Sequence, residues 1–267
     1  MKQENLLKLI DTHAHLDEME SLEPALDKAK EAGVMAIIAV GSNHQSNIKV
    51  MEISRRYHSF VYPALGLHPC ELGNLDPSHV DYALKFIEER VFDIVAIGEI
   101  GLDYDKRAVK AAPKELQKDA FRRLLALAKQ YEKPVSIHSR YASKDCFELV
   151  NGAGIEKAVF HWFTGSSSGL RDFGDAGHFI SATPAAEYHE EHKRAIKEVP
   201  LERLFLETDC PVVYGRETKY RSEPVDILRS MKAVAAVKGI DEITLAEQTT
   251  CNAVNFFGLT SPDILTA

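Results

Sequence analysis

The sequence lacks several features that would assign it to a familiar class. It has only four cysteines and no Cys-x-x-Cys pair: Cys70, Cys146, Cys210 and Cys251. This spacing predicts reduced thiols and argues against a disulfide framework or a zinc ribbon. No apolar run is long enough to span a bilayer, and no signal-peptide pattern precedes the first apolar segment. We therefore expect a cytoplasmic protein that does not enter a membrane.

An excess of positive charge is also missing. Lysine and arginine number 32 against 40 acidic residues, which gives a formal net charge of −8. Such a chain is not expected to coat nucleic acid, although a cleft within it can still bind a phosphate. Apolar residues make up 45% of the chain, which is enough for a core and excludes general disorder. The length fits one large α/β domain, and we expect a single domain over residues 1–267.

Apolar strands alternate with helical segments throughout the chain. The pattern predicts strands at Leu6–His13, Val34–Val40, Phe60–Leu67, Ile94–Ile97, Pro134–Ile137, Lys157–Phe160, Gly177–Ala182 and Leu204–Leu206. It predicts helices at Ser21–Ala32, Asn43–Tyr57, Pro77–Arg90, Pro113–Tyr131, Ser143–Val150, Ser167–Asp175, Glu187–Glu198, Glu223–Val237 and Asp241–Phe257. Strands that are apolar on both faces indicate a parallel sheet covered by helices. Eight such units favour a (β/α)₈ TIM barrel over the alternative, an open doubly wound sheet.

The first predicted strand ends in two histidines, His13 and His15, separated by one alanine. Residues i and i+2 of a strand project from the same face, so both imidazoles would point together from the strand end. Two neutral imidazole nitrogens suit one metal ion. The alternative is a pair of hydrogen-bonded histidines in a polar loop.

Other predicted strands also end in residues that can bind metal. Glu99, His138, His161 and Asp209 follow later strands, and His68 follows the third. In a barrel the carboxyl ends of the strands converge on one face, where active sites lie. Four histidines and two carboxylates there suffice for two divalent ions that share a bridging ligand. Taken singly, each residue has an ordinary alternative as a hydrogen-bonded or turn residue.

Some remaining histidines and the one tryptophan have separate interpretations. The histidines of His189-Glu190-Glu191-His192 are three residues apart, whereas a zinc-protease helix needs a spacing of four. We interpret Glu187–Glu198 as the solvated surface of a helix. His178 begins the seventh strand, at the end of the barrel away from the predicted site. Trp162 can either pack at the barrel mouth or stack on a base or sugar.

These motifs, in this order, resemble the TatD family of metal-dependent deoxyribonucleases, within the amidohydrolase-like barrels. The resemblance runs from His13 to about Phe257. It is carried by Asp11-Thr12-His13-Ala14-His15, Gly66-Leu67-His68-Pro69, Gly98-Glu99-Ile100-Gly101-Leu102-Asp103-Tyr104, Pro134-Val135-Ser136-Ile137-His138-Ser139-Arg140, His161-Trp162-Phe163-Thr164-Gly165, Glu207-Thr208-Asp209-Cys210-Pro211, Arg221-Ser222-Glu223-Pro224 and Asn252-Ala253-Val254-Asn255-Phe256-Phe257.

The resemblance implies a ligand set. It implies that His13, His15 and Asp209 hold one metal. It also implies that Glu99 bridges to a second metal held by His138 and His161, and that His68 faces the substrate phosphate. Two positions depart from the family pattern: Trp162 stands where a small residue is usual, and Cys210 where serine is usual. Neither removes a ligand, but both could alter the pocket.

We therefore expect a metal-dependent hydrolase, foremost a deoxyribonuclease that cleaves phosphodiester bonds at DNA ends with a metal-activated water. Asp209, Glu99 and His68 are the predicted catalytic residues, with Asp209 accepting the proton of the water. His68 and Arg140 are predicted to bind the phosphate oxygens. The cofactors would be two divalent ions, with zinc, manganese, iron and magnesium as candidates.

The substrate is the less determined part of this hypothesis. Cations on the loops that follow the strands, namely Lys106, Arg107, Arg216, Lys219 and Arg221, are expected to give the acidic chain a locally basic mouth. DNA is the expected partner, with no membrane and no obligate protein partner. The first alternative is a two-metal hydrolase of a small ester, lactone, amide or phosphotriester. The second is a metal-stabilised scaffold without catalysis.

Overall fold

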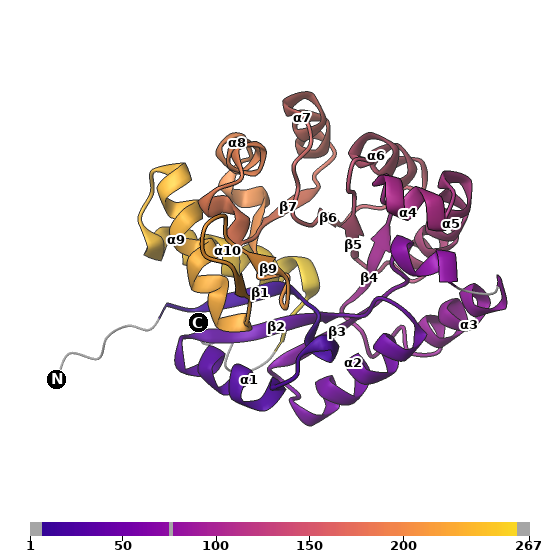
Figure 1. Cartoon of the computed structure of the whole chain (residues 1–267), viewed down its shortest axis with the longest axis horizontal. Coiled ribbons are helices and arrows are strands. Elements are labelled where there is room, and N and C mark those ends of the chain that lie inside the picture. Colours follow the sequence, from indigo (N-terminus) through magenta and orange to yellow (C-terminus); the bar gives the residue numbers. More distant parts are fainter. Residues whose placement is uncertain (1–6, 75–76, 261–267) are drawn as a thin grey trace.

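The computed structural model describes residues 7–74 and 77–260. Its centre is a parallel sheet in the strand order β1 to β8. The strands are β1 (Leu9–Ala14), β2 (Val34–Val40), β3 (Val61–Leu65), β4 (Ala96–Gly101), β5 (Val135–His138), β6 (Ala158–Phe160), β7 (Phe179–Ala182) and β8 (Leu204–Leu206). The α-helices are α1 (Leu22–Glu31), α2 (His44–Arg56), α3 (Pro77–Glu88), α4 (Lys106–Ala111), α5 (Lys114–Gln130), α6 (Ser143–Gly152), α7 (Ser167–Asp175), α8 (Glu190–Glu198), α9 (Ile227–Lys238) and α10 (Glu242–Phe257). Figure 1 shows the helices arranged around the strands in chain order.

The first and last strands of the sheet meet. Ala14 at the end of β1 forms a parallel bridge with Cys210, which follows β8. The backbone N–H of Asp209 donates to the carbonyl of His13 at 2.9 Å, and that of His15 donates to Cys210 at 2.8 Å. The sheet is therefore a nearly closed barrel surrounded by helices. This confirms the prediction of a (β/α)₈ barrel over an open sheet.

Successive residues of a strand belong to different parts of the core, as the pleat requires. In β2, Ile37 and Ala39 belong to the larger apolar cluster, which joins the strands to the helices. Ala36, Ile38 and Val40 belong to a smaller cluster. That cluster also contains Phe205 of β8 and Phe256 of α10, whose ring centroids are 5.2 Å apart. The interior of the barrel is thus packed with side chains, and α10 contributes to its floor.

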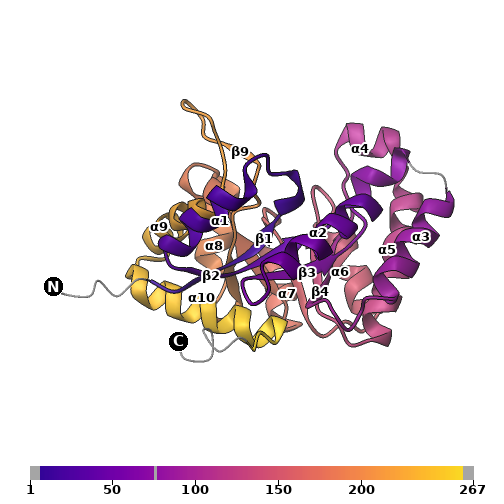
Figure 2. The same cartoon turned by 90° about the horizontal axis from the view of Figure 1, so that it is seen from below.

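The two ends of the barrel differ in what covers them. After β8 the chain forms a short antiparallel hairpin of β9 (Val213–Tyr214) and β10 (Tyr220–Arg221). Figure 2 shows this hairpin and α4 at one end of the molecule and α10 at the other. The hairpin and α4 follow the carboxyl ends of β8 and β4, so they flank the mouth of the barrel. The sequence pattern predicted neither of them.

Most predicted elements are present, with shifted ends. Strand β4 begins later than predicted and continues through Gly101, which places Glu99 inside the strand. The start predicted for the first strand, Leu6, lies outside the described residues. The segment expected to be one helix from Glu223 begins with a 3-10 turn, and α9 starts at Ile227. All four cysteines are free, and within residues 7–74 and 77–260 no helix is long and apolar enough to cross a membrane.

The interpretation of Glu187–Glu198 as a solvated helix surface is wrong for His192. Its side chain is fully buried. Its Nδ1 lies 2.9 Å from the carbonyl of Phe163, and its Nε2 accepts the backbone N–H of Thr183 at 3.2 Å. The imidazole therefore ties α8 to the loops that follow β6 and β7. Most other residues of this helix are charged, so nothing in the sequence indicated that His192 is buried.

His178 is also buried, but both of its ring nitrogens lack a hydrogen-bond partner among the described residues. Its imidazole packs near the rings of Phe147 and Phe160. Burial, with the nearby Arg203 guanidinium, lowers the pKa of His178 from 6.5 to about 4. Because the unfolded chain binds this proton more readily, the contribution of His178 to stability falls as the pH drops from about 6.5 to about 4.

This contrast predicts unequal effects of the same substitution at the two histidines. His178→Leu removes no hydrogen bond, so we expect its free energy of unfolding at pH 7 to stay within about 1 kcal/mol of wild type. At pH 5 the variant should be more stable than wild type by about 2 kcal/mol, since no imidazole remains to be protonated. His192→Leu leaves two buried backbone groups without a hydrogen-bond partner. Its free energy of unfolding at pH 7 should therefore be about 3 kcal/mol lower than that of wild type. Urea unfolding at both pH values measures these differences, and equal losses in the two variants would contradict the prediction.

Candidate metal centre

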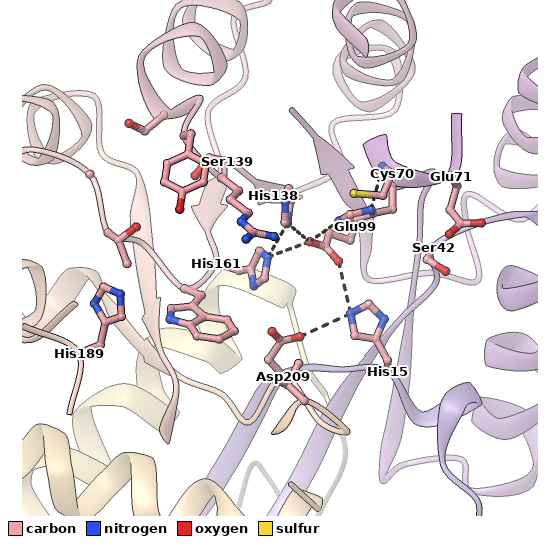
Figure 3. Close-up of a pocket in the computed structure, with 18 of the residues that line it drawn as sticks. His15, Ser42, Cys70, Glu71, Glu99, His138, Ser139, His161, His189 and Asp209 are labelled. Atoms are coloured by element: carbon pink, nitrogen blue, oxygen red, sulfur yellow. Dashed lines mark hydrogen bonds and ion pairs between the residues drawn. The ribbon is translucent and has the colours of Figure 1, made fainter. Parts of the chain in front are cut away.

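The carboxyl ends of five strands bring the six predicted ligands together. His13 lies in β1 and Glu99 in β4, and His138 is the last residue of β5. His15, His161 and Asp209 lie in the loops that directly follow β1, β6 and β8. Figure 3 shows the labelled side chains of His15, Glu99, His138, His161 and Asp209 directed toward one another. Glu99 is not a turn residue, since its strand continues past it to Gly101.

One group of donors lies between β1, β4 and the loop after β8. The Nε2 atoms of His13 and His15 are each 3.4 Å from Oε2 of Glu99. They lie 3.7 and 3.5 Å, respectively, from Oδ1 of Asp209. His13, His15 and Asp209 offer ligand atoms that all lie within 4.8 Å of one another.

These distances and the burial of the donors fit a divalent cation. Two ligands bonded at about 2.1 Å to a tetrahedral ion are separated by roughly 3.4 Å, close to the separations found here. Nε2 of His13 is buried and has no hydrogen-bond partner among the described residues. A buried nitrogen that faces two carboxylates and bonds to neither is the arrangement that a metal ligand requires.

A second group lies on the other side of Glu99. Oε1 of this carboxylate is 2.8 Å from Nδ1 of His138 and 2.7 Å from Nε2 of His161. These two nitrogens are 3.2 Å apart. Burial by itself would raise the pKa of Glu99, but the imidazoles of His161 and His68 hold it well below its usual range. Glu99 is thus an ionised carboxylate whose two oxygens face different sets of imidazoles.

A buried aspartate, Asp103, orients the ring of His138 from the side away from Glu99. The sequence alone did not indicate this role. Nε2 of His138 lies 3.0 Å from Oδ2 of Asp103, and a carboxylate can only accept, so Nε2 carries the proton. In the neutral ring that a metal ligand requires, the proton on Nε2 leaves the lone pair of Nδ1 facing Glu99 and His161. The carboxylate of Asp103 is itself positioned by the backbone N–H of Asp105, at 2.8 Å. Although burial opposes it, hydrogen bonding to His138 lowers the pKa of Asp103 to about 2.

A second unassigned carboxylate, Glu207, lies behind His161. Its Oε1 is 3.5 Å from Nδ1 of His161 and accepts the backbone N–H of Trp162 at 3.0 Å. Glu207 is fully buried, and it forms a further candidate ligand group with His13 and His161. Glu207 and Asp209 are two residues apart at the end of a strand, and this spacing was the signal that could have identified it.

His68 differs from the other histidines of the cluster. Its Nδ1 accepts the backbone N–H of Cys70 at 3.1 Å, so in the neutral ring the proton is on Nε2. Burial lowers the pKa of His68, which favours the neutral ring. Nε2 lies 3.5 Å from Oε1 of Glu99. With its lone pair already used by the backbone, His68 presents a hydrogen-bond donor to the centre, although it can also be grouped with Glu99 and His138 as a ligand.

Comparison with known proteins agrees with this geometry. A family model described as "TatD related DNase" matches residues 10–258. The chain belongs to this family. It is 37% identical to "Deoxyribonuclease TATDN3" of Homo sapiens over 261 residues, covering 93% of this chain and 94% of that protein. It is 33% identical to "Uncharacterized metal-dependent hydrolase YabD" of Bacillus subtilis, covering 93% of this chain and 98% of that protein.

A solved structure of the TatD family has the same fold. YJJV, described as a TATD homolog from Escherichia coli, superposes with a TM-score of 0.86 at 26% sequence identity. The alignment covers 96% of this chain and all of that one. The agreement extends over nearly the whole barrel, so the strand ends that carry the donor cluster belong to the shared fold.

The two departures from the TatD pattern have different positions. Cys210 is fully buried, and its backbone binds His15 and Thr208 rather than lining the pocket. Trp162 lines the cavity at the barrel mouth, together with His161 and Asp209. Of these two residues, only Trp162 lies on the wall of the cavity.

The five cations predicted for the mouth loops are not among the described residues that line the cavity itself. The cavity at the barrel mouth measures about 940 Å³, and Arg140 is the only arginine or lysine among its described lining residues. Glu18, Glu71 and Glu191 line the same cavity. Lys106 and Arg107 begin α4, Arg216 donates to the carbonyl of Tyr188, and Arg221 lies 3.4 Å from Glu20. The charge of the mouth therefore depends on what the metal centre binds.

The contact between Asp103 and His138 predicts an effect on metal affinity. Asp103→Asn weakens the acceptor that fixes the proton on Nε2 of His138, so we expect 10- to 100-fold weaker binding of zinc at the second group. Competition with a chelator of known affinity measures the change. Asp145→Asn is the control, because that carboxylate binds Tyr104 and Lys118 and no histidine. Equal affinities in wild type and Asp103→Asn would show that Asp103 does not support a ligand.

Proposed function

We propose that this chain is a metal-dependent deoxyribonuclease that hydrolyses phosphodiester bonds at DNA ends. The observation that carries the proposal is the position of Glu99, whose two carboxylate oxygens face separate sets of imidazoles. His13, His15 and Asp209 would hold one divalent ion, His138 and His161 the other, and Glu99 would contact both. The human relative is named a deoxyribonuclease and the Bacillus relative a metal-dependent hydrolase, and both names support the proposal.

Bound divalent ions would supply Lewis-acid activation of water and neutralise charge on the phosphate; zinc, manganese, iron and magnesium are the candidates. Asp209 would accept the proton of the attacking water through Oδ1, which faces the centre. Burial would raise the pKa of Asp209, but the hydrogen bond from His15 outweighs it, so the carboxylate is ionised and ready to accept.

The substrate phosphate would be held by two donors that line the cavity beside the centre. His68 would donate from Nε2, as its hydrogen bond with Cys70 requires. Arg140 lines the cavity, is more than half exposed and lies 3.8 Å from Asp105, so it is free to turn toward a phosphate oxygen. The predicted cytoplasmic location and independence from an obligate protein partner belong to this proposal as well.

One observation favours the alternative of a small ester, lactone, amide or phosphotriester as substrate. The cavity has three rim glutamates and one arginine, and such a surface gives a long polyanion few contacts. A short unpaired end of DNA needs fewer phosphate contacts than a duplex, so the nuclease proposal is restricted to strand ends.

The decisive experiment is hydrolysis of end-labelled single-stranded DNA with added zinc, manganese or magnesium. Wild type should degrade the strand from its end, and EDTA should stop the reaction. Glu99→Ala is the matched inactive variant. A wild type no faster than Glu99→Ala on DNA, together with turnover in a panel of small esters and lactones, would replace the proposal with the alternative.

A further inference from the structure

Trp162 is the single tryptophan of the chain and directly follows His161 of the metal centre. It lines the mouth cavity together with Asp209, and its side chain is only partly buried. The next residue, Phe163, is 1% exposed and packs against Phe173. The chain thus places one aromatic residue in the core and the preceding one on the cavity wall.

The indole of Trp162 packs against the ring of Tyr214. Its ring centroid is 5.4 Å from that of Tyr214, at an interplanar angle of 48°. Tyr214 is fully buried in the hairpin, and its hydroxyl donates to the carbonyl of Thr208 at 2.9 Å. The indole therefore rests on a fixed aromatic ring that is anchored beside the metal centre.

The backbone of Trp162 is fixed as well. Its φ of +41° lies in the left-handed region, which a tryptophan rarely adopts. Its N–H donates to Oε1 of Glu207 at 3.0 Å and lies 3.3 Å from the hydroxyl of Ser181. Strain of this kind persists where surrounding contacts over-determine the conformation. These contacts orient the residue that follows the ligand His161.

A packing role alone does not account for the indole. A buried tryptophan normally finds an acceptor for its ring N–H, whereas Trp162 is only partly buried and its ring N–H makes no hydrogen bond among the described residues. Because Arg140 is the only arginine or lysine on the described cavity wall, a bound strand finds few cationic side chains for its phosphates away from the metal centre. Stacking on an aromatic ring is the other main source of affinity for single strands, and it tolerates any base.

We propose that Trp162 forms a base-stacking subsite beside the metal centre, on which the unpaired terminal nucleobase of a DNA strand stacks. The subsite rests on the proposed deoxyribonuclease function. It positions the terminal nucleotide through its base, so a strand end without a base is a poorer substrate. Trp162 is thereby a specificity-determining residue and takes no part in the proton transfer at Asp209.

The fluorescence of the single tryptophan tests the subsite without any turnover. Titration of the metal-loaded protein with dAMP should give a saturable loss of fluorescence, and 2-deoxyribose 5-phosphate should give none. The matched control is the double variant Trp162→Phe, Phe92→Trp. Phe92 is 86% exposed and precedes β4, so it lies at the other end of the barrel. Equal quenching in this control, or by both ligands, would overturn the proposal.

A second measurement compares kcat/KM for two end-labelled strands, one with a normal terminal nucleotide and one with an abasic terminal nucleotide. Wild type should prefer the normal end by roughly tenfold, the size expected for one stacked base. Trp162→Ala should reduce this ratio to about one, and Trp162→Phe should restore most of it. Tyr141→Ala removes an exposed ring from the same cavity and should keep the preference.

A ratio near one in wild type, or an unchanged ratio in Trp162→Ala, would overturn the proposal. The two proposals can fail separately. Absence of DNA hydrolysis in wild type removes the nuclease function, and the fluorescence titration then still decides whether a nucleobase stacks on Trp162.

Discussion

Replacing Glu99 with glutamine is expected to lower the rate of DNA hydrolysis by more than about 1,000-fold. Glutamine keeps the volume of the side chain but removes its negative charge and offers one oxygen in place of two. Glu99 lies 2.8 and 2.7 Å from ring nitrogens on one side and 3.4 Å on the other, so the change affects both groups of donors. The amount of bound zinc per chain should fall together with the rate. Elemental analysis and the end-labelled DNA assay measure the two quantities.

The control for Glu99→Gln is Glu191→Gln. Glu191 is an exposed carboxylate that lines the same cavity and makes no contact with the donor cluster. Its removal changes the net charge by the same amount and should leave zinc binding unaltered. If the two variants lose the same small fraction of activity, charge alone accounts for the effect. If Glu99→Gln keeps both its metal content and its rate, Glu99 does not bridge the two groups.

The ligand candidates could be predicted because their positions follow from a rule of topology. A parallel barrel brings every strand end to one face, so a histidine or carboxylate at a strand end is placed there without knowledge of any loop. His13, Glu99 and His138 lie within their strands, and the structure holds them near one another as that rule requires. The error in the predicted start of β4 did not matter, since Glu99 remained near its end.

The supporting residues could not be predicted in the same way. Asp103 reaches His138 because Gln117, on α5, fixes its backbone at 2.8 Å, a contact between distant segments that no local pattern reveals. His192 is buried inside a strongly charged helix, and Tyr214 lies in a hairpin too short to give a strand signal. The charge of the mouth was also beyond the sequence, since which cations line a cavity depends on loop conformations.

Replacing Asp209 separates its two proposed roles. The amide introduced by Asp209→Asn cannot accept a proton, but it keeps an oxygen where Oδ1 of the aspartate lies. This variant is therefore expected to retain much of the bound metal while kcat falls by about 100- to 10,000-fold, the range for loss of a general base. KM should change little, because the residues proposed to hold the phosphate, His68 and Arg140, are unchanged. Asp209→Ala also removes the oxygen proposed as a ligand and should lose metal as well as rate.

The distinguishing measurements are metal content and single-turnover rate of both variants at saturating DNA. Because the pKa of Asp209 is held below its usual value, wild type should show no loss of rate from its protonation at any pH above about 5. An Asp209→Asn protein that keeps both its metal and its rate would show that another group accepts the proton. Glu207 is then the next candidate, since its Oε2 is buried and has no hydrogen-bond partner among the described residues. Glu207→Gln in the Asp209→Asn background would test it, provided that the metal content is measured alongside the rate, because Glu207 also belongs to a candidate ligand group.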